Sequence, residues 1–169
     1  MHFIEKEAKK LIKKYKTNDP YEICSAMGIQ CFAVDMCSDI NGFCYTYNGI
    51  KCIFINNLLP KFKQKLTCIH ELAHTIFHEN YSYKFILEDT YFCLDKYEKE
   101  AEFFVSCFLI PDVSSLFQYE GLTLYEIAYN LNVPKDYVTL RFQYYKNKDC
   151  SLGFEAELLN NLNQSILYN

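Results

Sequence analysis

Two histidines and a glutamate near the middle of the chain have the spacing of a zinc site. His70, Glu71 and His74 belong to the run HELAH, residues 70–74. Residues four apart lie on one face of a helix, so both imidazoles can reach the same ion. This is the HExxH pattern of zinc enzymes. Glu71 is too close to the first histidine to share its metal easily, but it can reach a metal-bound water as a general base.

An apolar stripe in the same segment indicates that this helix packs inside the fold. The stripe has helical spacing and consists of Leu66, Ile69, Ala73, Ile76 and Phe77. A surface helix that happens to carry two histidines would not need such a stripe. The sequence therefore predicts a packed helix with its histidines turned toward a neighbouring element.

A third protein ligand is needed, because catalytic zinc is held by three protein groups and a water. His78 is eight residues after His70, about 12 Å along a straight helix at 1.5 Å per residue, which is too far to share an ion. A carboxylate must then complete the set. Nearby carboxylates occur in the helix expected after Asp95, which carries Glu98, Glu100 and Glu102.

Periodicity leaves the choice between Glu98 and Glu100 open, since both flank the apolar face of their helix. Glu98 stands three residues after Asp95, where it can serve as a capping-box partner. That structural role favours Glu100 as the third ligand. The sequence thus predicts a Zn²⁺ site made of His70, His74 and Glu100, with Glu71 as the catalytic base.

Composition limits the class of protein. The chain has 169 residues, half of them hydrophobic, and a net charge of -4. A compact domain with a small helical appendage fits this length, and the charge argues against direct nucleic-acid binding. No apolar run approaches the ~20 residues of a membrane-spanning helix, so no membrane partner is expected. Nothing in the sequence specifies an oligomeric state.

The nine cysteines are scattered singly and form no CxxC pair. This distribution is typical of reduced, buried thiols and not of a disulfide framework or a cysteine-ligated zinc site. We therefore expect a soluble, cytoplasmic protein.

The order of expected elements predicts an α+β fold. An amphipathic helix spans residues 3–16, and a short helix follows Asp19 and Pro20. Strands are expected at 29–34, 42–47 and 50–56, the last two joined by the type I′ turn signal Asn48-Gly49. The prediction is a small, largely antiparallel β-sheet packed on a helical zincin-type core, with C-terminal helices.

The remaining segments suggest a division of the chain at residue 116. Residues 80–94 lack clear periodicity, and a helix after Asp95 runs to Pro111. A capping box at Thr123 opens a further helix, residues 134–142 form another, and a weak helix follows Ser151. We expect a metallopeptidase domain at 1–116 and a C-terminal helical extension with helix-turn-helix-like packing at 117–169, together forming one compact unit.

Several motifs together resemble the ImmA/IrrE family of small zinc metallopeptidases. In chain order they are KTNDPYEICSAMGI, IFINNLL, HELAHTIFH, EKEAEFFVSCFLIP and AYNLNVPKDYVTLR. They cover most of residues 15–142. The resemblance implies zinc binding by His70, His74 and Glu100 and a general base at Glu71. The chain departs from the family pattern at Ala73, where glycine is common, and at residues 102–105, where Glu-Phe-Phe-Val replaces the usual asparagine and Phe-Ala pair.

The sequence and the resemblance together predict a zinc-dependent endopeptidase that cleaves a protein. The resemblance implies that the target is a helix-turn-helix transcriptional repressor of a prophage, a mobile element or a stress regulon. The alternative is a zinc-binding regulatory module that acts by contact, without proteolysis. Glu71 favours the enzyme, because an interaction domain has no need of a base beside its metal ligand.

Overall fold

The computed structural model describes residues 1–78, 91–112, 116, 118–119 and 121–148 of the chain. It divides into two compact units, Met1–Phe108 and Leu109–Asn169. The boundary expected after residue 116 falls inside the second unit. Of the stretch 80–94, residues 80–90 lie outside the described residues, as does the tail from Ser151, whereas residues 91–94 begin helix α5 (Tyr91–Leu109), which therefore starts before the predicted Asp95. In the described part of the chain, no helix is long and apolar enough to cross a membrane.

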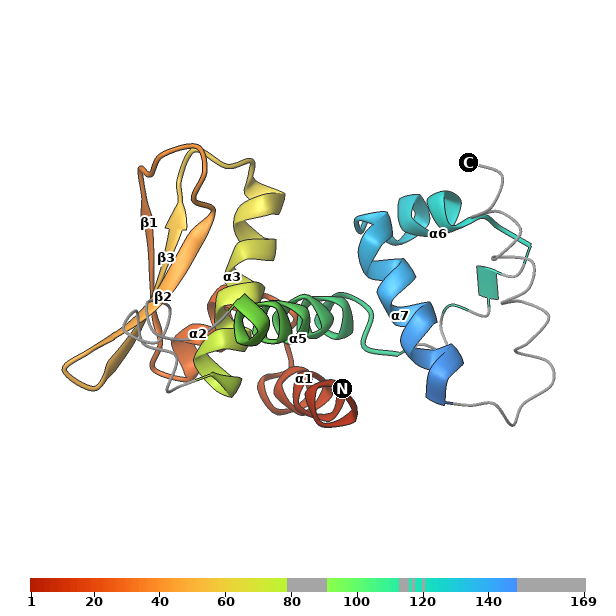
Figure 1. The fold of residues 1–169 in the computed structure, drawn as a ribbon, viewed down its shortest axis with the longest axis horizontal. Helices are drawn as coiled ribbons and strands as arrows, with labels where there is room; N and C mark the ends of the chain where they lie inside the picture. The colour runs from red at the N-terminus through yellow and green to blue at the C-terminus, as the bar shows by residue number, and fades with distance from the viewer. Residues whose placement is uncertain (79–90, 113–115, 117, 120, 149–169) are drawn as a thin grey trace. The chain divides into compact units, whose positions relative to one another are not determined.

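A three-stranded sheet in the first unit confirms the α+β class. Its strands are β1 (Gln30–Val34), β2 (Gly42–Tyr47) and β3 (Ile50–Asn56), in the order β1-β3-β2 (Figure 1). The β2–β3 pair is an antiparallel hairpin, and its two turn residues have positive φ, 48° at Asn48 and 78° at Gly49, as a type I′ turn requires. The β1–β3 pair is parallel.

The sheet is therefore mixed, whereas the sequence predicted it to be largely antiparallel. The hairpin places β3, and not β2, next to β1. The chain leaves β1, crosses to the far edge as β2, and returns through the centre in the direction of β1. The hairpin signal fixed the local pair, but the placement of β1 depends on distant contacts.

Within the described residues, the helices that accompany the sheet are α1 (His2–Tyr15), α2 (Pro20–Ala26), α3 (Lys61–Phe77) and α5 (Tyr91–Leu109). The predicted cap of α2 is present, because Asp19 Oδ1 accepts a hydrogen bond of 2.9 Å from the Tyr21 backbone N–H. The other oxygen of Asp19 lies 3.0 Å from Lys65 Nζ. This ion pair joins the start of α2 to α3.

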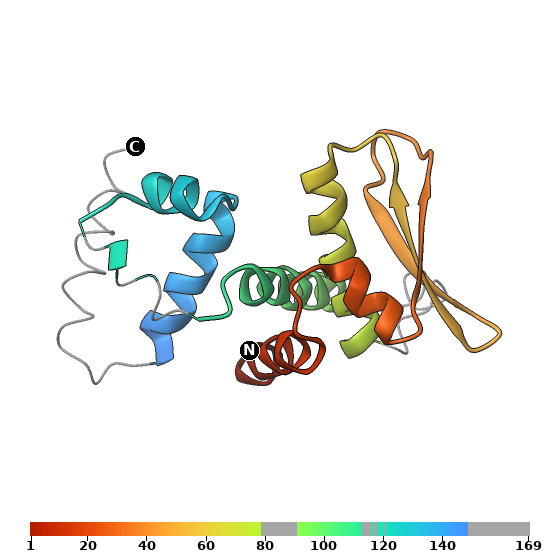
Figure 2. The same ribbon diagram turned by 180° about the vertical axis from the view of Figure 1, so that it is seen from behind.

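Helix α3 lies beside the sheet in both ribbon views and provides much of the core (Figures 1 and 2). Of the predicted stripe, Ile69 and Ala73 are buried, whereas Leu66, Ile76 and Phe77 are half-buried. Cys68 and Leu72, which are outside that stripe, are fully buried. An edge-on contact between Phe77 and Phe104, with ring centroids 5.4 Å apart, joins α3 to α5. The histidine-bearing helix is thus a central element of its unit.

The second unit contains α6 (Leu124–Leu131) and α7 (Lys135–Lys148) with a core of their own. The predicted capping box of Thr123 and Glu126 is present. Arg141, the only arginine of the chain, is fully buried and donates from Nε to the Ile110 carbonyl at 3.1 Å. It is therefore a structural residue, and its charge is not on the surface where a nucleic-acid backbone would be contacted.

Gly42 allows β2 to approach α3 closely. A Cβ atom at this position would lie 2.5 Å from Thr67 Cγ2 and 2.6 Å from the Phe54 carbonyl oxygen. The second atom is backbone and cannot rotate away. Hydrogen is thus the only side chain that this packing of strand on helix admits.

Replacement of Gly42 by alanine is expected to destabilise the fold by about 1–3 kcal/mol, the usual cost of overpacking. Urea denaturation followed by circular dichroism measures the difference. The control is Ser38→Ala in the exposed loop before β2, for which a change within about 0.5 kcal/mol is expected. If Gly42→Ala is as stable as the wild type, the close approach of β2 to α3 is not as described.

Candidate metal centre and active site

Two imidazoles from α3 and one carboxylate from α5 come together. The Nε2 atoms of His70 and His74 are 3.1 Å apart. Glu98 places Oε2 3.1 Å from His70 Nε2 and Oε1 3.4 Å from His74 Nε2. The two histidines converge because they are four residues apart on one helical face. Glu98 reaches them because α5 packs against that face.

The separations of these three groups fit one zinc ion. Nitrogen and oxygen ligands bind zinc at ~2.0–2.1 Å, and at the corners of a tetrahedron they lie about 3.3 Å from each other. Here the two nitrogens are 3.1 Å apart, and they lie 3.1 and 3.4 Å from two different oxygens of Glu98, so a zinc ion would take one of these oxygens after a shift of the carboxylate. The Glu98 side chain is 52% exposed, so the group can be reached from solvent. Its donor atoms can hold a metal with little rearrangement.

Glu100, the third ligand expected from the sequence, lies in a different contact. Its Oε2 is 3.0 Å from His78 Nε2, and His78 Nδ1 is 2.9 Å from His74 Nδ1. The structure therefore brings Glu98 to the pair of histidines and Glu100 to His78. Residues two apart on a helix do not face the same side, so only one of these glutamates can face the pair.

The hydrogen bonds between Glu100 and His78 and between His78 and His74 determine which nitrogen of His74 carries its proton. The Glu100 carboxylate accepts a hydrogen bond, so His78 carries its proton on Nε2. His78 Nδ1 then accepts from Nδ1–H of His74, and the lone pair of His74 Nε2 is left facing Glu98 and His70. Outer hydrogen bonds of this kind orient histidine ligands in metal sites.

His70 has an outer carboxylate of its own. Its Nδ1 lies 3.2 Å from Glu102 Oε1. Each histidine of the pair is therefore held through its Nδ1 atom by an outer partner, while its Nε2 atom faces the other histidine. Glu102 was one of three nearby carboxylates in the sequence and was given no role there, although it is four residues after Glu98 and therefore on the same face of α5. That spacing was the available signal.

The electrostatics of the group favour a cation. Burial alone lowers the pKa of His70, but hydrogen bonds to Glu102 and Glu98 outweigh it and raise the value to about 10. Burial and the positive charge of His70 lower the pKa of His74 to about 4. The hydrogen bond from His70 also lowers the pKa of Glu98. One positive charge is thus stabilised among an imidazole pair and two carboxylates.

Glu71 is buried next to this group, beside strand β2. Burial raises the pKa of Glu71 to about 7, although the charge of His70 and hydrogen bonds with Cys44 lower it in part. Cys44 belongs to β2, and burial together with the nearby Glu71 raises the pKa of its thiol to about 12. A carboxyl with a pKa near neutrality can both accept and return a proton.

Several known proteins are similar to this chain in sequence or in fold. Residues 24–149 match the IrrE N-terminal-like domain of peptidase family M78. Uncharacterized immunity region protein 2 of Bacillus phage phi105 is 37% identical over 140 residues, which are 82% of this chain and 88% of that protein. A Mycobacterium tuberculosis transcriptional regulator has a similar fold, with a TM-score of 0.60 and 13% identity. That similarity covers 84% of this chain but 56% of the regulator, and it concerns the fold alone.

Proposed function

Because this chain belongs to the IrrE N-terminal-like domain family of peptidases, as its resemblance to ImmA/IrrE proteins predicted, we propose that it is a zinc-dependent endopeptidase with a protein substrate. The observation that carries the proposal is the group formed by His70, His74 and Glu98, with the buried Glu71 beside it. Two imidazoles and a carboxylate suit zinc. Family membership supports a peptidase; the metal, the reaction and the target are proposed.

We assign the zinc ligands to His70, His74 and Glu98, and not to the Glu100 that the sequence favoured. The three separations near 3.3 Å support this set. Glu100 then acts one step further out, by holding the proton of His78 and through it the orientation of His74. When bound, zinc supplies a water of lowered pKa and polarises the scissile carbonyl.

Glu71 is the proposed general base. Its carboxyl accepts the proton of the attacking water and passes it to the leaving amine of the cleaved peptide bond. Burial supports this role, because a pKa of about 7 is matched to proton transfer in both directions near neutral pH. The rival module, which binds without hydrolysis, gives no reason for such a carboxyl at this place.

Strand β2 is the proposed docking edge for the substrate. Among the described residues, β2 is paired on one side only, with β3. Cys44, within β2, contacts Glu71, so this edge strand passes beside the proposed active site. An extended peptide can add to the free edge through main-chain hydrogen bonds. The scissile bond of that peptide would then lie near Glu71.

The proposed target is a helix-turn-helix transcriptional repressor of a prophage, a mobile element or a stress regulon. The similarity to an immunity region protein of a phage supports a role in phage regulation. We place this reaction in the cytoplasm, where such a repressor acts. The second candidate remains a zinc-binding regulatory module that holds the repressor without cutting it.

The replacement Glu71→Gln is expected to slow cleavage of the repressor about 10²–10⁴-fold, the usual contribution of a general base, while zinc content stays the same. The assay mixes the protein with the repressor encoded beside its gene and follows fragments by gel and mass spectrometry. Glu22→Gln, at an exposed position on α2, is the matched control and should cleave normally.

If Glu71→Gln cleaves the repressor at the wild-type rate, Glu71 is not the general base. If the wild-type protein forms a stable complex with the repressor but does not cleave it at any zinc level, the regulatory module is favoured.

Zinc retention is expected to separate Glu98 from Glu100. Glu98→Gln should lose the metal on dialysis against a mild chelator, because it removes an anionic ligand. Glu100→Gln should keep a metal whose affinity is about 10–100-fold weaker, the usual effect of removing an outer hydrogen-bond partner. Metal analysis and chelator competition measure both variants. The opposite order would return the third ligand to Glu100.

A further inference from the structure

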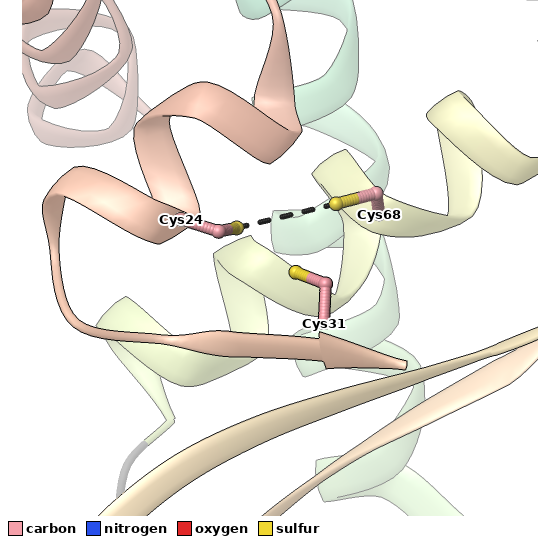
Figure 3. A group of neighbouring side chains, drawn as sticks. All are labelled: Cys24, Cys31 and Cys68. Carbon is pink, nitrogen blue, oxygen red and sulfur yellow. Dashed lines mark hydrogen bonds between the residues drawn. The ribbon is translucent and has the colours of Figure 1, made fainter. Parts of the chain in front are cut away.

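Three cysteines from three different elements form a second cluster in the first unit. Cys24 lies on α2, Cys31 on β1 and Cys68 on α3. Figure 3 shows the three thiols turned toward one another, with a hydrogen bond of 4.0 Å between the sulfurs of Cys24 and Cys68. All three Sγ atoms lie within 4.8 Å of one another. The sequence predicted reduced, buried thiols and no cysteine-ligated metal site, because these residues form no CxxC pair and Cys68 is far along the chain from the other two.

The spacing of the sulfurs fits a single ion at their centre. Three sulfurs at ~2.3 Å from an ion in a trigonal plane are about 4.0 Å apart. The measured distance between Cys24 and Cys68 is 4.0 Å. Among the described residues, no imidazole or carboxylate joins the three thiols within ligand distance. The cluster therefore offers sulfur atoms only.

Burial and access both suit a bound ion. Cys24 and Cys68 have no exposed surface, which protects their thiols from competing ligands. Cys31 is half-buried and lines a cavity of about 240 Å³, together with Tyr21, Gln64 and other residues of α2, β1 and α3. This cavity gives an ion a path to the sulfur of Cys31. The other two sulfurs lie within 4.8 Å of the Cys31 sulfur.

We propose that Cys24, Cys31 and Cys68 form a three-thiolate site that binds one Cu(I) ion. Soft thiolates select soft cations such as Cu(I), and three sulfurs without a fourth donor suit an ion of low coordination number better than tetrahedral zinc. Each thiol that binds as thiolate releases its proton to solvent. The bound ion cross-links α2, β1 and α3.

The site is separate from the proposed zinc centre in both position and chemistry. Cys68 is two residues before His70 on α3, and residues two apart do not share a helical face. The zinc centre offers nitrogen and oxygen donors, while the cysteine cluster offers sulfur. The inference therefore stands independently of peptide hydrolysis.

The test is an anaerobic titration of the reduced full-length protein with Cu(I), after one equivalent of zinc has been added. A chromophoric Cu(I) chelator competes and reports affinity. One tightly bound copper per chain is expected, with X-ray absorption showing three sulfur neighbours. Affinity should fall at least 100-fold in Cys31→Ser and in Cys68→Ser. Cys37→Ser, at an exposed thiol outside the cluster, should bind as the wild type does.

Thermal unfolding gives a second readout, because an ion that joins three elements stabilises the folded state. Cu(I) should raise the Tm of the wild type and of Cys37→Ser, but not that of Cys31→Ser. Circular dichroism checks folding. If Cys68→Ser does not fold, the half-buried Cys31→Ser decides the question. Equal copper affinity in wild type and Cys31→Ser, or fewer than three sulfurs around the copper, would overturn the proposal.

Discussion

The packing of α5 against the histidine face of α3 is the interaction on which the candidate site depends. Helix α3 can align His70 and His74 by itself, but it has no carboxylate that reaches both. The contact between Phe77 and Phe104 helps to hold the two helices together, and it brings Glu98 within 3.1 Å of His70. The same packing places Glu102 against His70 and Glu100 against His78, which in turn contacts His74. One helix pair thus supplies the inner donor groups and their outer partners.

Much of this could be predicted from local sequence. The spacing of His70 and His74, the Asp19 cap, the Asn48-Gly49 turn and the Thr123 capping box all depend on residues a few positions apart. The α+β class and the family followed from motifs in the correct order. The choice of Glu98 at the histidine pair, and of Glu100 at His78, could not be predicted in this way. It depends on the rotation of α5 about its own axis, which contacts with α3 determine.

The same limit explains the sheet and the cysteines. The parallel pairing of β1 with β3 joins strands that β2 separates along the chain, and Cys24 and Cys68 are 44 residues apart. Both features depend on how α2, β1 and α3 meet. As a result, α3 carries the imidazoles of His70 and His74 on one face and the thiol of Cys68 on another. Metals of different softness would then be kept apart by donor type and by position on one helix.

The most direct test of the account is a crystal structure of the zinc-loaded protein with anomalous data at the zinc edge. The account predicts one strong peak about 2.0–2.2 Å from Nε2 of His70, Nε2 of His74 and a carboxylate oxygen of Glu98. Glu100 should remain hydrogen-bonded to His78. A zinc peak bound to Glu100, or a peak only among the three cysteines, would contradict the assignment of the metal centre.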